Sequence, residues 1–265
     1  MPKLETQGIA LHYETVGDRA KPPLMLIAGL GGVGAGWGPQ IERFAAEHFV
    51  IVPDHRGTGQ TTRAAEGYSI AQHAADMAAL IAHLDIGPAH IVGSSTGGAI
   101  AQLLALDHAA QVRSVTVASS FACPDGFMRR QFALRRKLIA EGDMQMACNC
   151  AALFLFSPRY ARDNPQRVAA WIDRTAGLPP EPDIAVKRID MIMAHDAFAR
   201  LGEIRQPVLV LCGDDDFCTP LHLSEDIAGA VHSAELKVLH GAGHFVYVEQ
   251  EQCFFDTVRA FVGRH

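Results

Sequence analysis

The sequence predicts an α/β protein in which a mostly parallel sheet is covered by helices on both faces. Short apolar segments alternate along the chain with longer segments of helical periodicity, a pattern typical of strands joined by helical crossovers. After the first, the apolar segments are nearly continuous in Leu, Ile and Val, as expected of strands buried on both faces. One stretch, residues 121–200, contains helical segments but no strand-like segment, which indicates a helical insertion.

Seven segments are predicted as strands because each is short, apolar and rich in β-branched residues or leucine. They are Ile9–Val16, Pro23–Ala28, Val50–Pro53, His90–Gly93, Ser114–Ala118, Pro207–Cys212 and Glu235–Leu239.

Helices are predicted between these strands. Ser69-Ile-Ala-Gln72 matches the capping box that begins a helix, which we expect to continue to about Leu84, before Gly87-Pro88. Two further segments with helical spacing are Thr96–Asp107 and Gln250–Val262. The helices expected in the insertion are Phe127–Glu141, Met144–Phe154, Asn164–Arg174 and Ile184–His195. We therefore predict a sheet core of residues 1–120 and 201–265 and a helical cap of residues 121–200.

Composition excludes several classes of protein. The 265 residues are 49% hydrophobic and 20% charged, so the chain can bury enough apolar surface to fold. The net charge of −6 argues against a nucleic-acid-binding protein, which needs a basic face. No window has the roughly 18 apolar residues of a membrane span, and the N-terminus lacks a signal-peptide core. We expect a soluble, cytoplasmic protein with reduced cysteines, no membrane or nucleic-acid partner, and either a monomeric or a homodimeric state.

The strongest chemical signal is Gly93-Ser94-Ser95-Thr96-Gly97, between a predicted strand and a predicted helix. It matches G-x-S-x-G in one frame only, with Ser95 at the centre. A sharp turn from strand to helix holds a serine hydroxyl exposed, and the glycines leave room for neighbouring backbone. The N-terminus of the helix also offers free N–H groups to a developing oxyanion. Ser95 is therefore a candidate nucleophile.

A serine nucleophile needs a base, and the base needs an orienting acid. The loop after the strand Pro207–Cys212 contains three candidate acids, Asp214, Asp215 and Asp216. The loop after the last predicted strand, Gly241-Ala-Gly-His244, supplies a candidate base. Both loops follow the carboxyl ends of strands, where open α/β sheets place their sites.

Over essentially its full length the chain resembles the α/β-hydrolases. Ser95 matches their nucleophile elbow, Asp216 the acid of their G-D-x-D-x-x-x-P pattern, and His244 the base of their G-x-G-H pattern. The resemblance implies an eight-stranded, mostly parallel sheet with a helical cap inserted after the sixth strand. It also implies a serine hydrolase that uses no cofactor and no metal.

The segment Ile27-Ala-Gly-Leu-Gly-Gly32 matches the family's oxyanion loop, and Asp54-His-Arg-Gly-Thr-Gly59 matches its D-x-R-G-x-G loop. By this resemblance the oxyanion donors are the backbone N–H groups of Leu30 and Thr96, whereas the second loop shapes the fold without taking part in chemistry. The chain departs from the family at position 28, where Ala replaces a common His, and at position 94, where Ser stands for another common His.

Two other kinds of site are weaker interpretations. His240 and His244 have a spacing that could bind zinc on a helix, but they flank glycines at the end of a strand. Gly29–Gly34 resembles a dinucleotide fingerprint, but its glycine spacing is wrong. Residues expected to line a substrate pocket are Gly29, Phe121, Phe127, Phe154, Met193, Phe217 and Phe245.

The cap and the core differ in charge. Residues 121–200 carry 12 Lys/Arg and 9 Asp/Glu, a net charge of +3, so the remaining residues carry −9. The cluster Arg129-Arg130 and Arg135-Arg136-Lys137 is interpreted first as a solvated helix face and second as a site favouring an anionic substrate.

The sequence is similar to bacterial aminoacrylate (carbamate) hydrolases of pyrimidine utilisation and to 3-oxoadipate enol-lactonases, which act on small carboxylated compounds. We therefore expect hydrolysis of a small carboxylic ester, lactone or related acyl or carbamate substrate. The alternatives are a carbon–carbon bond hydrolase or a perhydrolase of the haloperoxidase type with the same triad, and a ligand receptor on the same fold.

Overall fold

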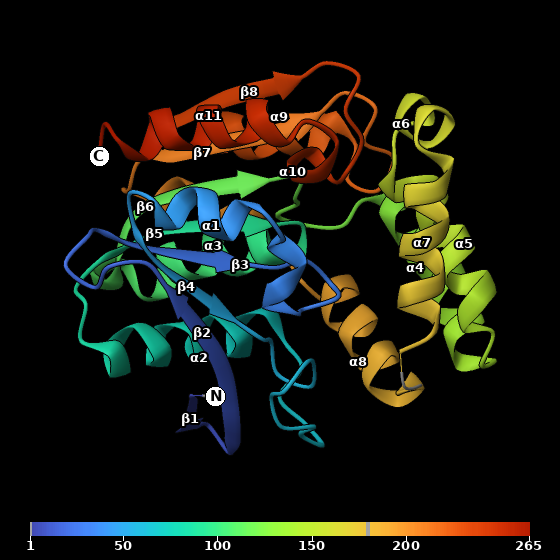
Figure 1. Ribbon diagram of the computed structural model, residues 1–265, viewed down its shortest axis with the longest axis horizontal. Helices are drawn as coiled ribbons and strands as arrows, with labels where there is room; N and C mark the ends of the chain where they lie inside the picture. Colours follow the sequence, from blue (N-terminus) through green and yellow to red (C-terminus); the bar gives the residue numbers. More distant parts are fainter. Residues whose placement is uncertain (1, 179–180) are drawn as a thin grey trace.

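One eight-stranded sheet organises the molecule, in the order β1-β2-β4-β3-β5-β6-β7-β8 (Figure 1). The structure is a computed structural model that describes residues 2–178 and 181–265. Its strands are β1 (Lys3–Thr6), β2 (Ile9–Val16), β3 (Pro23–Ile27), β4 (Phe49–Pro53), β5 (Ala89–Ser94), β6 (Val112–Ala118), β7 (Val208–Gly213) and β8 (Ala234–Leu239). β2 runs antiparallel to β1 and β4, and every other pair is parallel. The predicted fold class is confirmed.

The central strands are apolar on both sides because each side enters a separate core. In β3, Met25 and Ile27 belong to one core and Leu24 and Leu26 to the other, and all four side chains are fully buried. The same alternation holds in β7. Alternate side chains of such a strand point to opposite faces of the sheet. Because both faces are buried, every position is apolar and the sequence shows a continuous apolar run.

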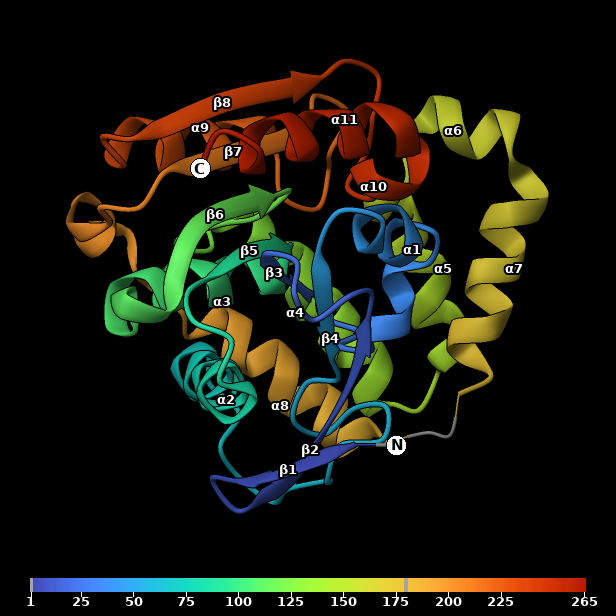
Figure 2. The same ribbon diagram turned by 60° about the vertical axis from the view of Figure 1, so that its left-hand side comes forward.

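Helices cover both faces of the sheet. On one face lie α2 (Ile70–Leu84), α3 (Thr96–Asp107) and α9 (Leu221–Ala230), and on the other α1 (Gln40–Ala45) and α11 (Glu251–Val262) (Figures 1 and 2). Short helical turns complete the core: η1 (Gly34–Trp37), η2 (Ala109–Gln111), η3 (Phe198–Glu203) and α10 (Val246–Glu249).

The seven predicted strands are all present, with ends within two residues of those expected. β1 was not predicted because it is short and its side chains are partly or fully exposed, so it lacks an apolar pattern. It pairs with β2 through a two-residue turn at Gln7 and Gly8, whose φ values of 47° and 76° suit a hairpin. No helix in the described residues is long and apolar enough to cross a membrane.

The predicted capping box at the start of α2 forms only in part. The Ser69 hydroxyl accepts a hydrogen bond from the Gln72 N–H at 3.0 Å, as expected of an N-cap. The Gln72 side chain does not reach back to Ser69; it donates to Asp76 at 3.1 Å. The helix ends at Leu84, as predicted.

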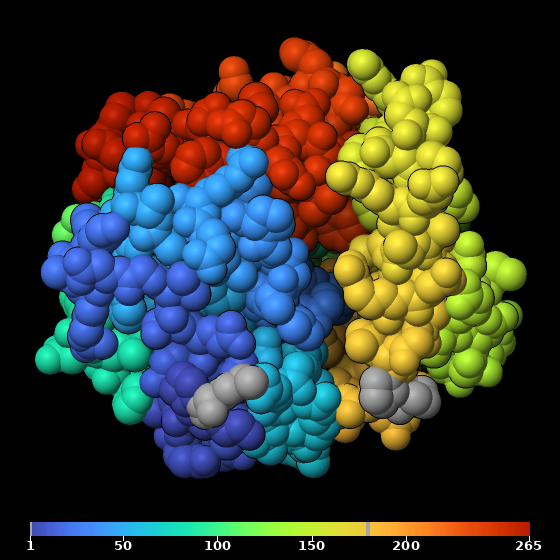
Figure 3. Space-filling model, in the orientation of Figure 1, coloured from blue at the N-terminus to red at the C-terminus, as the bar shows by residue number. Residues whose placement is uncertain are grey.

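The described residues between β6 and β7 form five α-helices ahead of η3: α4 (Gly126–Ala140), α5 (Met144–Leu155), α6 (Pro158–Asp163), α7 (Pro165–Ala176) and α8 (Pro182–Met193). They stand at the end of the sheet toward which the arrowheads of β3, β6 and β8 point (Figure 1). In the space-filling view, α6 and α7 form one side of the molecule, with a furrow between them and the N-terminal segments (Figure 3). The carboxyl ends of the parallel strands therefore face these helices.

Candidate active site

The strand register brings the candidate catalytic loops to one edge of the sheet. Neighbouring strands β5, β6, β7 and β8 are parallel, and the residues in register across them are Ser94, Ala118, Leu211 and Lys237. Ser95 directly follows the first of these residues, while Asp216 and His244 lie in the loops after β7 and β8. All three side chains are buried.

Ser95 occupies a strained turn between β5 and α3. Its φ of 56° and ψ of −120° lie outside the regions that side chains favour. The turn is held by the Ser95 N–H, which donates to Ala118 O at 2.8 Å, and by Ser120 Oγ, which donates to Ser95 O at 2.6 Å. A Cβ at Gly97 would lie 2.1 Å from Ile27 O, so only glycine fits there. This is the geometry of a nucleophile elbow.

Because the strain is stored at Ser95, glycine at this position is expected to stabilise the fold. We expect the Ser95→Gly variant to unfold with a free energy about 1 kcal/mol higher than that of Ser95→Ala, since glycine adopts a positive φ without steric cost. Urea unfolding of the two variants measures the difference. Equal stabilities would contradict the assignment of strain to this turn.

His244 and Asp216 form a buried pair. His244 Nδ1 lies 2.9 Å from one carboxylate oxygen of Asp216 and 3.1 Å from the other. Asp216 also accepts hydrogen bonds from the N–H groups of Cys218 and Thr219, both at 2.8 Å, and from Thr219 Oγ1 at 2.9 Å. Burial alone would lower the pKa of His244, but the Asp216 carboxylate raises it above its ordinary value. The carboxylate is thus fixed to orient one ring nitrogen.

The two other acids of this loop are placed differently. Asp214 pairs with His240 at 2.7 Å, but the His240 side chain is 85% exposed, whereas that of His244 is 2% exposed. Asp215 is partly exposed, and among the described residues its carboxylate has no hydrogen bond. Of the three acids, only Asp216 meets a buried histidine. The His244–Asp216 hydrogen bonds are therefore present, but in the described part of the chain no hydrogen bond joins Ser95 Oγ to His244.

The predicted oxyanion loop lies against Ser95. A Cβ built on Gly29 would lie 3.2 Å from Ser95 Cβ and 3.8 Å from Ser95 Oγ. In the described residues, no protein group accepts a hydrogen bond from the N–H of Leu30 or of Thr96. Both donors are therefore available to a substrate oxygen.

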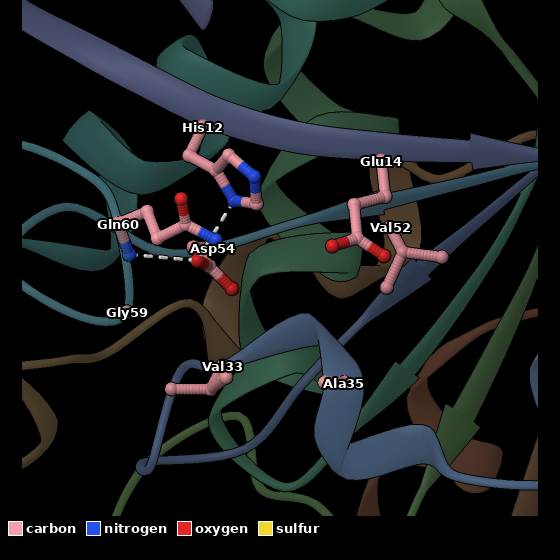
Figure 4. Close-up of a pocket in the computed structure, with 8 residues that line it drawn as sticks. All are labelled: His12, Glu14, Val33, Ala35, Val52, Asp54, Gly59 and Gln60. Carbon is pink, nitrogen blue, oxygen red and sulfur yellow. Dashed lines mark hydrogen bonds and ion pairs between the residues drawn. The ribbon is translucent and has the colours of Figure 1, made fainter. Parts of the chain in front are cut away.

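Asp54, the first residue of the D-x-R-G-x-G motif, contacts the start of η1, which follows this loop in the chain. Its carboxylate accepts hydrogen bonds from the N–H groups of Gly34 and Gln60 and lies near His12 Nδ1, each at 2.9 Å. Figure 4 shows His12, Asp54 and Gln60 at a small pocket of about 160 Å³, and no residue of the candidate triad lines this pocket. The geometry gives the motif a structural role. Among the described residues, no cluster of three or more His, Cys, Asp or Glu could hold a metal ion.

Sequence reasoning missed Glu249, which connects the helical insertion to the His244 loop. Its carboxylate accepts hydrogen bonds from Ser157 N at 3.0 Å, Ser157 Oγ at 2.7 Å and Gly243 N at 2.9 Å. Next to it, Leu155 O accepts a hydrogen bond from the His244 N–H at 3.0 Å. Burial raises the pKa of Glu249, while these hydrogen bonds oppose the rise. A single glutamate within a helix carries no sequence signal for such a role.

Replacing Glu249 by glutamine is expected to destabilise the protein by about 1–3 kcal/mol, because either orientation of the amide places its NH₂ against the N–H of Ser157 or of Gly243. Chemical unfolding measures this loss, and kcat is expected to fall with it because the His244 loop loosens. Glu251→Gln, which alters an exposed contact with Arg43, is the matched control and should change stability by less than about 0.5 kcal/mol. Equal effects of the two substitutions would contradict the role of Glu249.

The candidate pocket residues are spread over several environments. Phe121 is fully buried and packs edge-on against His195, at 5.8 Å between ring centroids. Phe127 and Phe217 are exposed, and the Phe127 ring contacts Phe154 at 6.2 Å. Phe245 packs among aromatic rings such as Phe156 of the helical insertion, Met193 is partly buried, and a Cβ on Gly29 would meet Ser95.

Comparison with known proteins agrees with this geometry. Residues 22–251 match the family described as alpha/beta hydrolase fold. A protein of Azorhizobium caulinodans provisionally named carbamate hydrolase RutD is 32% identical over 99% of this chain and 98% of its own length. The lactone-degrading enzyme Est816, which acts on N-acyl homoserine lactones, is 28% identical with a TM-score of 0.87, covering 98% of this chain and 100% of its own. The enol-lactonase of Burkholderia xenovorans LB400 shares the fold, with a TM-score of 0.91 and 24% identity over 99% and 100% of the two chains.

Proposed function

Because the chain belongs to the α/β-hydrolase family and is a hydrolase, we propose that it works through a serine nucleophile. Ser95 is the nucleophile, His244 its base and Asp216 the acid that orients the base. The observation that carries this proposal is the buried His244–Asp216 pair, located at the same edge of the sheet as the strained Ser95 turn. Residues 121–200 act as a cap above this edge.

The proposed reaction has two stages. Ser95 Oγ attacks a substrate carbonyl while His244 takes its proton, and the N–H groups of Leu30 and Thr96 stabilise the oxyanion. His244 then protonates the leaving group, which departs and leaves an acyl group on Ser95. Water activated by His244 attacks the acyl group, releases the acid and restores Ser95. None of these steps requires a cofactor.

We propose a small carbamate, carboxylic ester or lactone as the substrate. The names of RutD and Est816 support this range of acyl compounds. The basic cluster of α4 supplies no argument for an anionic substrate. Arg136 pairs with Asp190 at the surface, and Arg135 stacks over Phe132 within the cap. These contacts favour the interpretation of the cluster as a solvated helix face.

A panel of carbamates, enol-lactones, acyl-homoserine lactones, p-nitrophenyl esters and ring-cleavage ketones, run beside a peroxide-dependent halogenation assay in acetate, tests the substrate class. We expect turnover of at least one group and covalent labelling of the Ser95 peptide by a fluorophosphonate, detected by mass spectrometry. Binding of panel members without turnover would favour a ligand receptor. Cleavage confined to ring-cleavage ketones would favour a carbon–carbon bond hydrolase, and peroxide-dependent halogenation in acetate would favour a perhydrolase.

A further inference from the structure

Arg188 is a buried cation in the cap helix α8, and its residue surface is only 3% exposed. No carboxylate lies within 4.0 Å of its guanidinium among the described residues. A buried charge without a counterion is costly, because proteins normally pair such charges. Burial lowers the pKa of Arg188 to about 10, so the side chain is still charged at neutral pH.

The guanidinium is directed at the predicted oxyanion loop. Nε donates to Leu30 O at 3.1 Å, and Nη2 donates to the same oxygen. A Cβ at Gly32 would lie 2.6 Å from Nη2, so the guanidinium packs directly on the backbone of this loop. The contact joins residues 158 positions apart and ties α8 to the loop that lies against Ser95.

The remaining contacts hold Arg188 to the core. Nη1 donates to Arg56 O at 3.0 Å, and Nη2 lies 3.4 Å from His55 Nδ1. Burial, reinforced by the charge of Arg188, holds the pKa of His55 well below its ordinary value, so the imidazole is neutral and can accept. Because Arg188 directs its N–H groups at backbone oxygens and a neutral imidazole, it is not arranged to bind a substrate carboxylate.

We propose that Arg188 is a positioning residue for the oxyanion hole. Its guanidinium fixes the Leu30 backbone and adds positive charge near the place where the substrate oxygen becomes negative. This inference rests on the proposed serine mechanism. A preorganised cation in a site of low dielectric favours the transition state over the ground state. Since Arg188 belongs to α8, the cap takes part in building the hole as well as covering it.

Kinetics of the full-length Arg188→Met and Arg188→Lys variants test this role. For Arg188→Met we expect kcat to fall about 10²-fold while KM changes less than about threefold, because Arg188 stabilises only the transition state. Arg188→Lys keeps a positive charge and a hydrogen-bond donor, so its kcat is expected to be about tenfold higher than that of Arg188→Met. Arg136→Gln, which breaks the exposed contact between α4 and α8, is the matched control and should leave kcat within about twofold.

Inhibitor affinity separates positioning from a general loss of structure. A trifluoromethyl ketone that forms a tetrahedral adduct is expected to bind Arg188→Met about 10²-fold more weakly, whereas the carboxylate product binds as it does to the wild type. An equal loss for both inhibitors, or unchanged kcat, would overturn the role of Arg188. If Arg188→Met does not fold, Arg188→Lys provides the test. A parallel fall of kcat and ketone affinity in this variant supports the role of Arg188, and wild-type values of both overturn it. Absence of fluorophosphonate labelling at Ser95, together with absence of turnover of every panel substrate by the wild type, would instead reject the serine mechanism itself.

Discussion

Alanine at position 95 is expected to lower kcat by about 10⁶-fold, because the proposed nucleophile is removed. The variant should also show no burst of alcohol from an activated ester and no labelling by a fluorophosphonate. Stopped-flow absorbance with a p-nitrophenyl ester measures the burst. The fold should be retained, since the Ser95 hydroxyl makes no hydrogen bond within the described residues.

The neighbouring serine provides the control for this experiment. Ser94 ends β5, is also buried and lies one residue from the proposed nucleophile. We expect Ser94→Ala to keep its burst and to retain kcat within a few-fold. A full burst in Ser95→Ala would falsify the proposed nucleophile, and loss of the burst in Ser94→Ala would show that the turn tolerates no change.

Much of the sheet was predictable because its strands have a simple physical signature. A strand between two layers of helix must be apolar at every position, and β3 and β7 are. β1 is exposed and α6 has only six residues, so neither has a pattern that burial imposes. Burial alone does not explain which elements were found, because α1 and α9 carry buried side chains such as Phe44 and Ile227 and were not predicted, whereas the mostly exposed β8 was predicted.

The candidate site was predictable to the extent that it lies in loops of restricted geometry. The close approach of Gly97 to Ile27 O shows why a glycine follows Ser95, and this requirement is visible in the sequence. By contrast, Arg188 and Leu30 are 158 positions apart, and no periodicity marks a contact between a cap helix and a backbone oxygen. Residues that act through other residues therefore become visible only when the chain is folded.

Replacing Asp216 by asparagine is expected to lower kcat by about 10⁴-fold while the fold is retained. Asparagine keeps the size of the side chain, but its amide can present NH₂ to His244 Nδ1 and so favour the wrong tautomer. The substitution also removes the charge that stabilises the imidazolium formed during attack. Asp215→Asn is the matched control in the same loop, because this partly exposed carboxylate has no hydrogen bond among the described residues, and its kcat should change less than about twofold.

The residual activity of Asp216→Asn should also depend on pH in a defined direction. His244 acts as a base only when neutral, so activity is lost as pH falls through its pKa. In the wild type the Asp216 carboxylate raises that pKa against the effect of burial. Without the carboxylate, the largest influence that raises this pKa is lost while the effect of burial stays, so the acid limb of the kcat/KM profile must move to lower pH. An acid limb that stays in place would mean that a group other than Asp216 controls the protonation of His244.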